Sequence, residues 1–153
     1  MHRLLKVALA AVVVAGSATR VPAQANPLVG KWDIEYERGR RMENGEATPI
    51  MGKGQIAFAT AGDSIVATLQ PAARPDGTTP APVSFSGKLG PDGAHFVQEQ
   101  TAQINVNGEV RDQKIKMTWT FKAAGDALTG TLVRDLPGMG PTPPSAVKGS
   151  RAK

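Results

Sequence analysis

The feature that most constrains this chain is a strict alternation of apolar and polar residues in several short segments. A period of two is the signature of a β-strand with one buried face, and no segment after residue 25 shows the longer period of a helix. In two of these segments the apolar positions are Trp32, Ile34 and Tyr36, and Ile115, Met117, Trp119 and Phe121. The pattern predicts strands over residues 31–38, 53–60, 64–70, 82–89, 94–105, 110–122, 127–134 and 146–151.

Short connections between these strands fix how they pair. The dipeptide Asn107-Gly108 is typical of a two-residue type I′ hairpin, and counting back from it sets Gln98 opposite Met117. The apolar positions of both strands then share one face, whereas a slip of one residue would turn a whole strand over. Equivalent counts around the turns at 62–63 and 124–125 also keep the apolar positions together. Three agreeing hairpins predict an antiparallel meander.

Eight strands in this order predict an all-β fold, an eight-stranded antiparallel up-and-down β-barrel, because closure removes exposed strand edges. A sandwich of the immunoglobulin type is the alternative, but it needs crossovers that the short turns disfavour. Tight turns alternate with the long connections 39–52, 71–81 and 135–145, so one end of the barrel is closed and the other is rimmed by loops. Such a cup suits a small ligand.

Residues 1–25 are predicted to be a signal peptide, and residues 26–153 form the folded domain. Basic residues near the start, an apolar run over 7–16 and the small-x-small site Ala23-Gln24-Ala25 give the leader its signature. The run is too short to span a membrane, which takes about 20 apolar residues. We therefore expect a secreted or periplasmic protein, cleaved after Ala25, with no membrane span.

Composition excludes several kinds of site. The chain has no Cys, and after the leader it has one His, His95, so thiolate chemistry, most transition-metal sites and nucleophilic triads lack their residues. We expect no metal and no cofactor. Basic residues number 18 against 13 acidic ones, but three of the basic residues lie in the leader and the rest are interspersed with acids, so no nucleic-acid partner is expected.

The two ends of the domain resemble a known family. Gly30-Lys31-Trp32 resembles the G-x-W start of small bacterial secreted lipocalin-like (calycin-type) barrels, and Gly149-Ser150-Arg151 resembles their last strand. The 128–132 hairpin is similar to strands of the same domains and of avidin-type barrels. The resemblance implies structural roles for Trp32 and Arg151, with the guanidinium packed over the indole at the closed end.

Alternate positions of each predicted strand face the barrel interior, and these are the residues that a ligand would contact. Gln98 and Gln100 interrupt an otherwise apolar face, and a buried amide needs partners from protein, water or ligand. Two interiors remain open at this point, one filled by side chains and one holding a small cavity. The candidate ligand-binding residues on this face are Tyr36, Phe58, Gln98, Gln100, Met117 and Trp119.

Three arginines, Arg38, Arg111 and Arg134, share inward parity near the open end. Together they could bind a carboxylate whose apolar tail runs down the barrel. Alternatively they are rim charges paired with neighbouring acids such as Glu37, Glu109 or Asp135. The acidic residues at 33, 35 and 37 have the opposite parity and are interpreted as a solvated outer face.

The sequence therefore predicts a non-catalytic binding protein for a small, mainly apolar ligand, one that can carry a carboxylate. The alternative function is a structural or interaction module of the cell envelope with a filled barrel and no small-molecule ligand. An enzyme is a third class, in which Tyr36 or Glu109 would act, but no constellation of residues supports it.

Overall fold

The computed structural model describes residues 26–44, 46–106 and 109–153, so the predicted leader and the Asn107-Gly108 turn lie outside the described residues. Within the described ranges the regular structure consists of strands alone, and no helix is available that could cross a membrane. The strands are β1 (Gly30–Glu43), β2 (Glu46–Ala61), β3 (Ser64–Pro71), β4 (Val83–Gly90), β5 (Gly93–Val106), β6 (Glu109–Ala124), β7 (Ala127–Leu136), β8 (Gly140–Pro141) and β9 (Ser145–Arg151).

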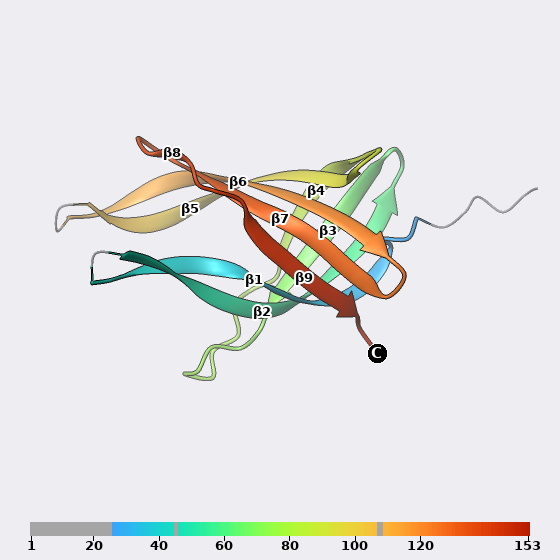
Figure 1. Ribbon diagram of the computed structural model, residues 1–153, viewed down its shortest axis with the longest axis horizontal. Helices are drawn as coiled ribbons and strands as arrows, with labels where there is room; N and C mark the ends of the chain where they lie inside the picture. The colour runs from blue at the N-terminus through green and yellow to red at the C-terminus, as the bar shows by residue number, and fades with distance from the viewer. Residues whose placement is uncertain (1–25, 45, 107–108) are drawn as a thin grey trace, which may run out of the picture.

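Eight of these strands form a closed ring, and every pairing is antiparallel (Figure 1). Neighbours in sequence pair from β1 to β7, and β9 lies between β7 and β1, which closes the barrel. The two-residue strand β8 adds to β7 outside this ring. The predicted up-and-down barrel is confirmed.

The predicted register between β5 and β6 is also confirmed. Gln98 lies opposite Met117 and Phe96 opposite Trp119, and the ladder reaches Val106 opposite Glu109. All four residues of these two inner pairs are buried. Parity along the sequence therefore gave the inner face of both strands.

The connection 39–52, expected to be a loop, is instead the outer part of a long hairpin. β1 continues to Glu43 and β2 begins at Glu46, with Glu43 opposite Glu46 across a two-residue connection. Asn44 has a φ of 52°, the left-handed conformation that Asn tolerates in tight hairpin turns. Asn44-Gly45 is thus the same hairpin signal in the sequence as Asn107-Gly108, and this hairpin was not predicted.

Two ribbons extend beyond the barrel as a result. We call residues 39–43 with 46–50 the first arm, and residues 101–106 with 109–114 the second arm. Figure 1 shows both arms projecting to the left, on the same side as β8, while the tight turns and the C-terminus lie at the opposite end. The predicted closed and open ends are thereby located.

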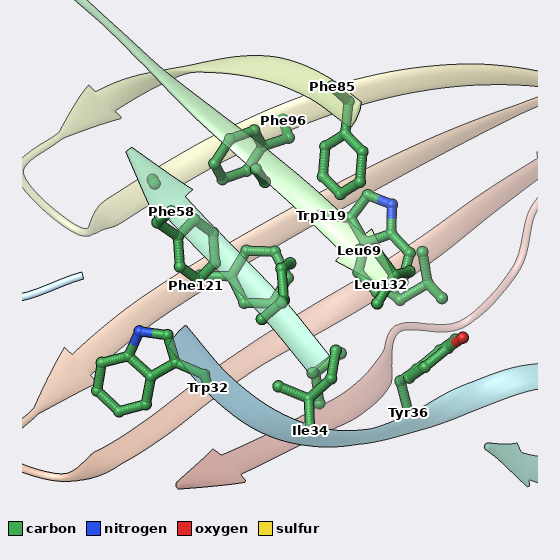
Figure 2. Packing of buried hydrophobic residues seen from close by; sticks show 14 of the residues in the cluster. Trp32, Ile34, Tyr36, Phe58, Leu69, Phe85, Phe96, Trp119, Phe121 and Leu132 are labelled. Carbon is green, nitrogen blue, oxygen red and sulfur yellow. The ribbon is translucent and has the colours of Figure 1, made fainter. Parts of the chain in front are cut away.

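A cluster of aromatic rings fills the barrel toward its closed end (Figure 2). The Phe58 ring lies 5.1 Å from Phe121 and 5.8 Å from Phe96, measured between centroids. Each aromatic side chain buries some 150–250 Å² on average, so such a cluster dominates the hydrophobic stabilisation of a domain of this size. Toward its closed end, the barrel is therefore filled by a core of buried aromatic and aliphatic side chains.

Candidate ligand-binding site

The floor of the open end is set by the aromatic cluster, and Phe58 belongs to it. Its side chain is 2% exposed and contacts other rings of the core. Phe58 was predicted to be a ligand-binding residue, but it is not among the residues that line the cavity at the open end. Its inward parity was predicted correctly, but its depth along the barrel was not.

Trp32 and Arg151 meet at the closed end, as the lipocalin resemblance implied. They are opposite each other in the β1–β9 ladder, and the Arg151 guanidinium carbon lies 4.3 Å from the centre of the indole. Trp32 Nε1 donates to the Leu28 carbonyl at 2.8 Å, and Arg151 also donates to the carbonyl of Pro27 at 3.0 Å. The pair therefore joins the first strand, the last strand and the N-terminal segment of the domain.

Above the floor lies a cavity of about 150 Å³. Seven of the nine ligand-binding candidates line it: Tyr36, Arg38, Gln98, Gln100, Met117, Trp119 and Arg134. Leu69, Pro71 and Val83 complete its wall, and these three were not anticipated. The barrel interior is therefore packed toward the closed end and hollow toward the open end.

Gln98 and Trp119 form the polar contact at the bottom of this cavity. Trp119 Nε1 donates to Gln98 Oε1 at 3.3 Å, and both side chains are buried. The bond occupies the acceptor of the amide and leaves its NH₂ group as the donor that a ligand could use. The predicted need of the buried amide for a partner is met in part by the indole.

Tyr36 also lines the cavity, and Figure 2 shows its ring together with the Trp119 indole. The two rings are 5.7 Å apart with an interplanar angle of 62°, an edge-to-face contact. Burial raises the pKa of the Tyr36 hydroxyl above its ordinary value, although Arg38 and Arg134 act in the opposite direction. The hydroxyl is therefore neutral at physiological pH and can both donate and accept a hydrogen bond.

Arg134 joins β7 to β1 near the mouth of the barrel, a junction that we call the seam, and it is already paired with an acid there. The ladder between β1 and β9 ends at Glu35–Lys148. Toward the mouth, the β7 edge that carried β9 pairs with the two-residue β8 instead, and no described strand pairs with β1 on this side. Arg134 spans this gap, with its Nη1 3.3 Å from Glu37 Oε1 and its Nη2 donating to the Glu37 carbonyl oxygen. Burial lowers the pKa of Arg134, and Glu37 partly offsets the effect.

Glu37 was interpreted as part of a solvated outer face, and this was wrong. Its side chain is 5% exposed and also accepts from Arg40 Nε at 2.8 Å. The cause is a β-bulge, because the β1–β2 register shifts between Glu37 and Gly39. A bulge places one extra residue in a strand and re-aims the side chains around it, so strict alternation fails at this point.

Arg38 is the extra residue of this bulge and is exposed, although it still lines the cavity. Its aliphatic stem lies across Gly52, where a Cβ atom would stand 3.1 Å from Arg38 Cδ. Gly52 thus provides the space that lets the guanidinium reach the mouth. Arg38 and Arg134 are both near the opening, as predicted, but only Arg134 is committed to an acid there.

Arg111 does not join them. It lies on the second arm with its side chain 64% exposed, and its Nε is 3.1 Å from Glu109 Oε2. The alternative interpretation of the three arginines, as rim charges paired with nearby acids, therefore describes Arg111 and Arg134. Glu109 is 66% exposed, which removes most of the case for it as an acid-base group.

A larger groove of about 1010 Å³ continues from the cavity to the outside. It shares Tyr36, Arg38 and Gln100 with the cavity and runs between the first arm and the connection 72–82. Lys53 and Arg74 add positive charge, while Asp76 accepts from the Thr78 amide and hydroxyl within its own turn, which lowers its pKa. The mouth is therefore cationic.

A second groove, of about 730 Å³, lies on the outer wall across β9, β1, β2 and β3. Asp33 and Glu35 share it with Lys53 and Lys148, so its charges are mixed. In the part of the chain that the structure describes, no group of three or more His, Asp or Glu side chains is arranged to hold a metal ion.

Comparisons with known proteins identify no family. No family model matches the chain, and no curated protein matches it either. Among solved structures, the monomer form of the PknI sensor domain from M. tuberculosis is similar, with 16% sequence identity and a TM-score of 0.49 over 82% of this chain and 87% of that one. At this level the likeness carries no functional argument, and the lipocalin resemblance stays a prediction.

Proposed function

We propose that this protein binds a small ligand at the open end of the barrel, with an apolar group in the cavity and an anionic group at the cationic mouth. The cavity of about 150 Å³ carries this proposal. A cavity of similar volume engineered into another protein binds benzene, whereas pockets for whole drug-sized ligands hold about 300–1,000 Å³. One ring or a short branched chain would fit inside, and the rest of the ligand would lie in the mouth groove.

The polar groups around the cavity suit a carboxylate or a similar anion. Arg38 lines both cavity and groove, and Lys53 and Arg74 add two more cations near the exit. Arg134 is held by Glu37, so the anion would pair with Arg38. The Gln98 amide and the Tyr36 hydroxyl can fix the orientation of the ligand by hydrogen bonds.

We propose binding without catalysis. Tyr36 has a raised pKa and therefore holds its proton at neutral pH, which makes it a poor general base. If the predicted leader directs export, this binding takes place outside the cytoplasm. A ligand there would be collected from the medium or the envelope.

Calorimetric titration with small aromatic and aliphatic carboxylates tests the proposal. Arg38→Gln should weaken the binding of a carboxylate by about tenfold, as expected for loss of a charge-assisted hydrogen bond, and should leave the neutral alcohol analogue unaffected. Arg111→Gln is the matched control, because that arginine is paired on the second arm away from the cavity. Equal losses in both variants, or no binding of any compound, would refute the proposal.

The alternative, an interaction module of the envelope, draws support from Met139. This side chain is 73% exposed in the connection between β7 and β8, at the open end. The alternative predicts that Met139→Ser abolishes retention of the protein on isolated envelope fractions, while the cavity binds no small molecule. Saturable ligand binding that Met139→Ser leaves intact would favour the first function.

A further inference from the structure

Among the described residues, the two arms expose strand edges that no other strand covers. β5 pairs with β6 along its length, but its ladder with β4 ends at Phe96 opposite Gly87. In an antiparallel ladder alternate residues direct their backbone groups to opposite sides. The pair Gly90–Gly93 closes the β4–β5 hairpin, and the pair Val106–Glu109 closes the β5–β6 hairpin. The odd-numbered residues of β5 therefore direct their backbone N–H and C=O groups toward the β4 side. The Gly87–Phe96 pair is a non-hydrogen-bonded one, so the ladder still uses the Val97 N–H, and beyond Val97 residues 99, 101 and 103 present amides and carbonyls to no strand that the structure describes.

The other three arm edges carry features that discourage pairing. Pro49 lies on the free edge of β2 and has no N–H to offer. Residues 38–43 of β1 contain three arginines and one glutamate, and residues 109–114 of β6 contain four charged residues among six. Charged residues and Pro are the usual means of keeping an exposed edge from pairing.

The β5 edge has no such protection. Residues 97–103 read Val-Gln-Glu-Gln-Thr-Ala-Gln, with one charge and neither Pro nor Gly. Val97, Glu99, Thr101 and Gln103 are all exposed. An extended, nearly uncharged edge with β-forming residues is a template for a further strand.

We propose that a second copy of this chain pairs with this edge, β5 against β5 in antiparallel orientation, with Thr101 on the two-fold axis. An antiparallel pair of identical strands is self-complementary, so one surface serves both subunits. In this register the odd-numbered residues that face outward pair with one another, Glu99 with Gln103 and Thr101 with Thr101 of the other copy. The single charge of the segment then faces an amide, and the Thr–Thr pair is favourable across strands.

A substitution at the axis can remove the proposed contact without damage to the barrel. The Thr101 N–H points away from β6, so Thr101→Pro removes a donor of the free edge and leaves the β5–β6 ladder its hydrogen bonds. Thr101→Lys keeps the backbone unchanged and sets two like charges across the axis. Asp112→Pro is the matched control, because residue 112 faces outward on the free edge of β6.

Sedimentation velocity over a concentration series is the measurement. The wild type and Asp112→Pro should dimerise, and both Thr101 variants should dimerise about tenfold more weakly or not at all, as loss of a pair of hydrogen bonds would produce. Circular dichroism confirms that each variant is folded. A wild type that stays monomeric at millimolar concentration, or a dimer that neither Thr101 variant weakens, would overturn the proposal.

Cross-linking checks the register directly. The chain contains no Cys, so Thr101→Cys introduces the sole thiol, and the axis brings the two copies within the Cα separation that a disulfide needs. Mild oxidation should yield a disulfide-linked dimer for Thr101→Cys and not for Asp112→Cys. The reverse result would assign the contact to the second arm's other edge and refute pairing through β5.

Discussion

The closed and open ends of this barrel are built from the same strands but differ in what fills them. At the closed end, Trp32 and Phe96 are fully buried, and tight turns join the strands. At the open end, the same strands continue into two arms, and the interior holds polar side chains and a cavity. The difference indicates that packing at the closed end supplies most of the stability, while the open end leaves room for the binding that we propose.

The strongest test of this division removes a ring from the floor. Phe96→Ala should lower the free energy of unfolding by about 3–5 kcal/mol, because it deletes buried surface and leaves a void that rigid strands cannot close. Urea denaturation followed by fluorescence measures the change. Gln100→Ala, at the exposed mouth, should cost less than about 1 kcal/mol. Comparable losses at the two sites would contradict the division.

Two glycines give the next contrast. A Cβ at Gly130 would lie 2.1 Å from the Thr120 carbonyl oxygen, whereas one at Gly39 would meet nothing within 4 Å. Gly130→Ala should therefore destabilise the protein by up to about 3 kcal/mol through overpacking. Gly39→Ala should be neutral or slightly stabilising, because it reduces the freedom of the unfolded chain. The same denaturation assay compares them, and a neutral Gly130→Ala would show that the wall is looser than described.

A substitution at the seam between β1 and β7 should lower the free energy of unfolding by an intermediate amount. Glu37→Gln leaves the Arg134 guanidinium with a neutral partner in a largely buried position. We expect a loss of about 2 kcal/mol, less than the 3–5 kcal/mol of a fully buried pair. A double-mutant cycle with Arg134→Met isolates the coupling between the two side chains. Additive losses would mean that the contact does not hold the seam.

The smallest expected effect concerns Tyr36 at high pH. Its pKa is raised in the folded protein, so the unfolded chain releases this proton first as pH rises. The stability should be constant in neutral solution and should fall as pH rises above about 10, the ordinary pKa of Tyr. The chain has a single Tyr, so phenolate absorbance reports this group alone. Ionisation below pH 10 would contradict its burial, and Tyr36→Phe should remove the signal.

Much of this fold was predictable from local pattern, because alternation fixes which residues face inward. Met117 and Trp119 were placed correctly, and the register around Gly62-Asp63 was also correct. The count around 124–125 was two residues off, because Ala124 pairs with Ala127, but an even offset keeps the apolar positions on one face. The Asn44-Gly45 turn also had a clear local signal, which was overlooked in a connection containing Gly, Pro and Thr. Its arm was therefore open to prediction.

The remaining wrong predictions concern how far along the barrel axis a residue lies and which strands are its neighbours when the barrel closes. Alternation does not give the height of a residue along the barrel axis, so Phe58 in the floor and Arg111 on an arm were grouped with residues of the cavity. The bulge at Arg38 occurs where β1 loses β9 as a neighbour, a long-range circumstance that a short segment does not reveal. It turned Glu37 inward and produced the contact with Arg134.

The chain holds two tryptophans, one at each end, and they allow the most direct test of the proposed binding site. Trp32 donates to Leu28 in the floor, and Trp119 donates to Gln98 in the cavity. In NMR titrations with benzoate and short branched carboxylates, the indole N–H resonance of Trp119 should shift saturably while that of Trp32 stays in place. If no such compound moves Trp119, or if both indoles move together, the cavity is not a binding site.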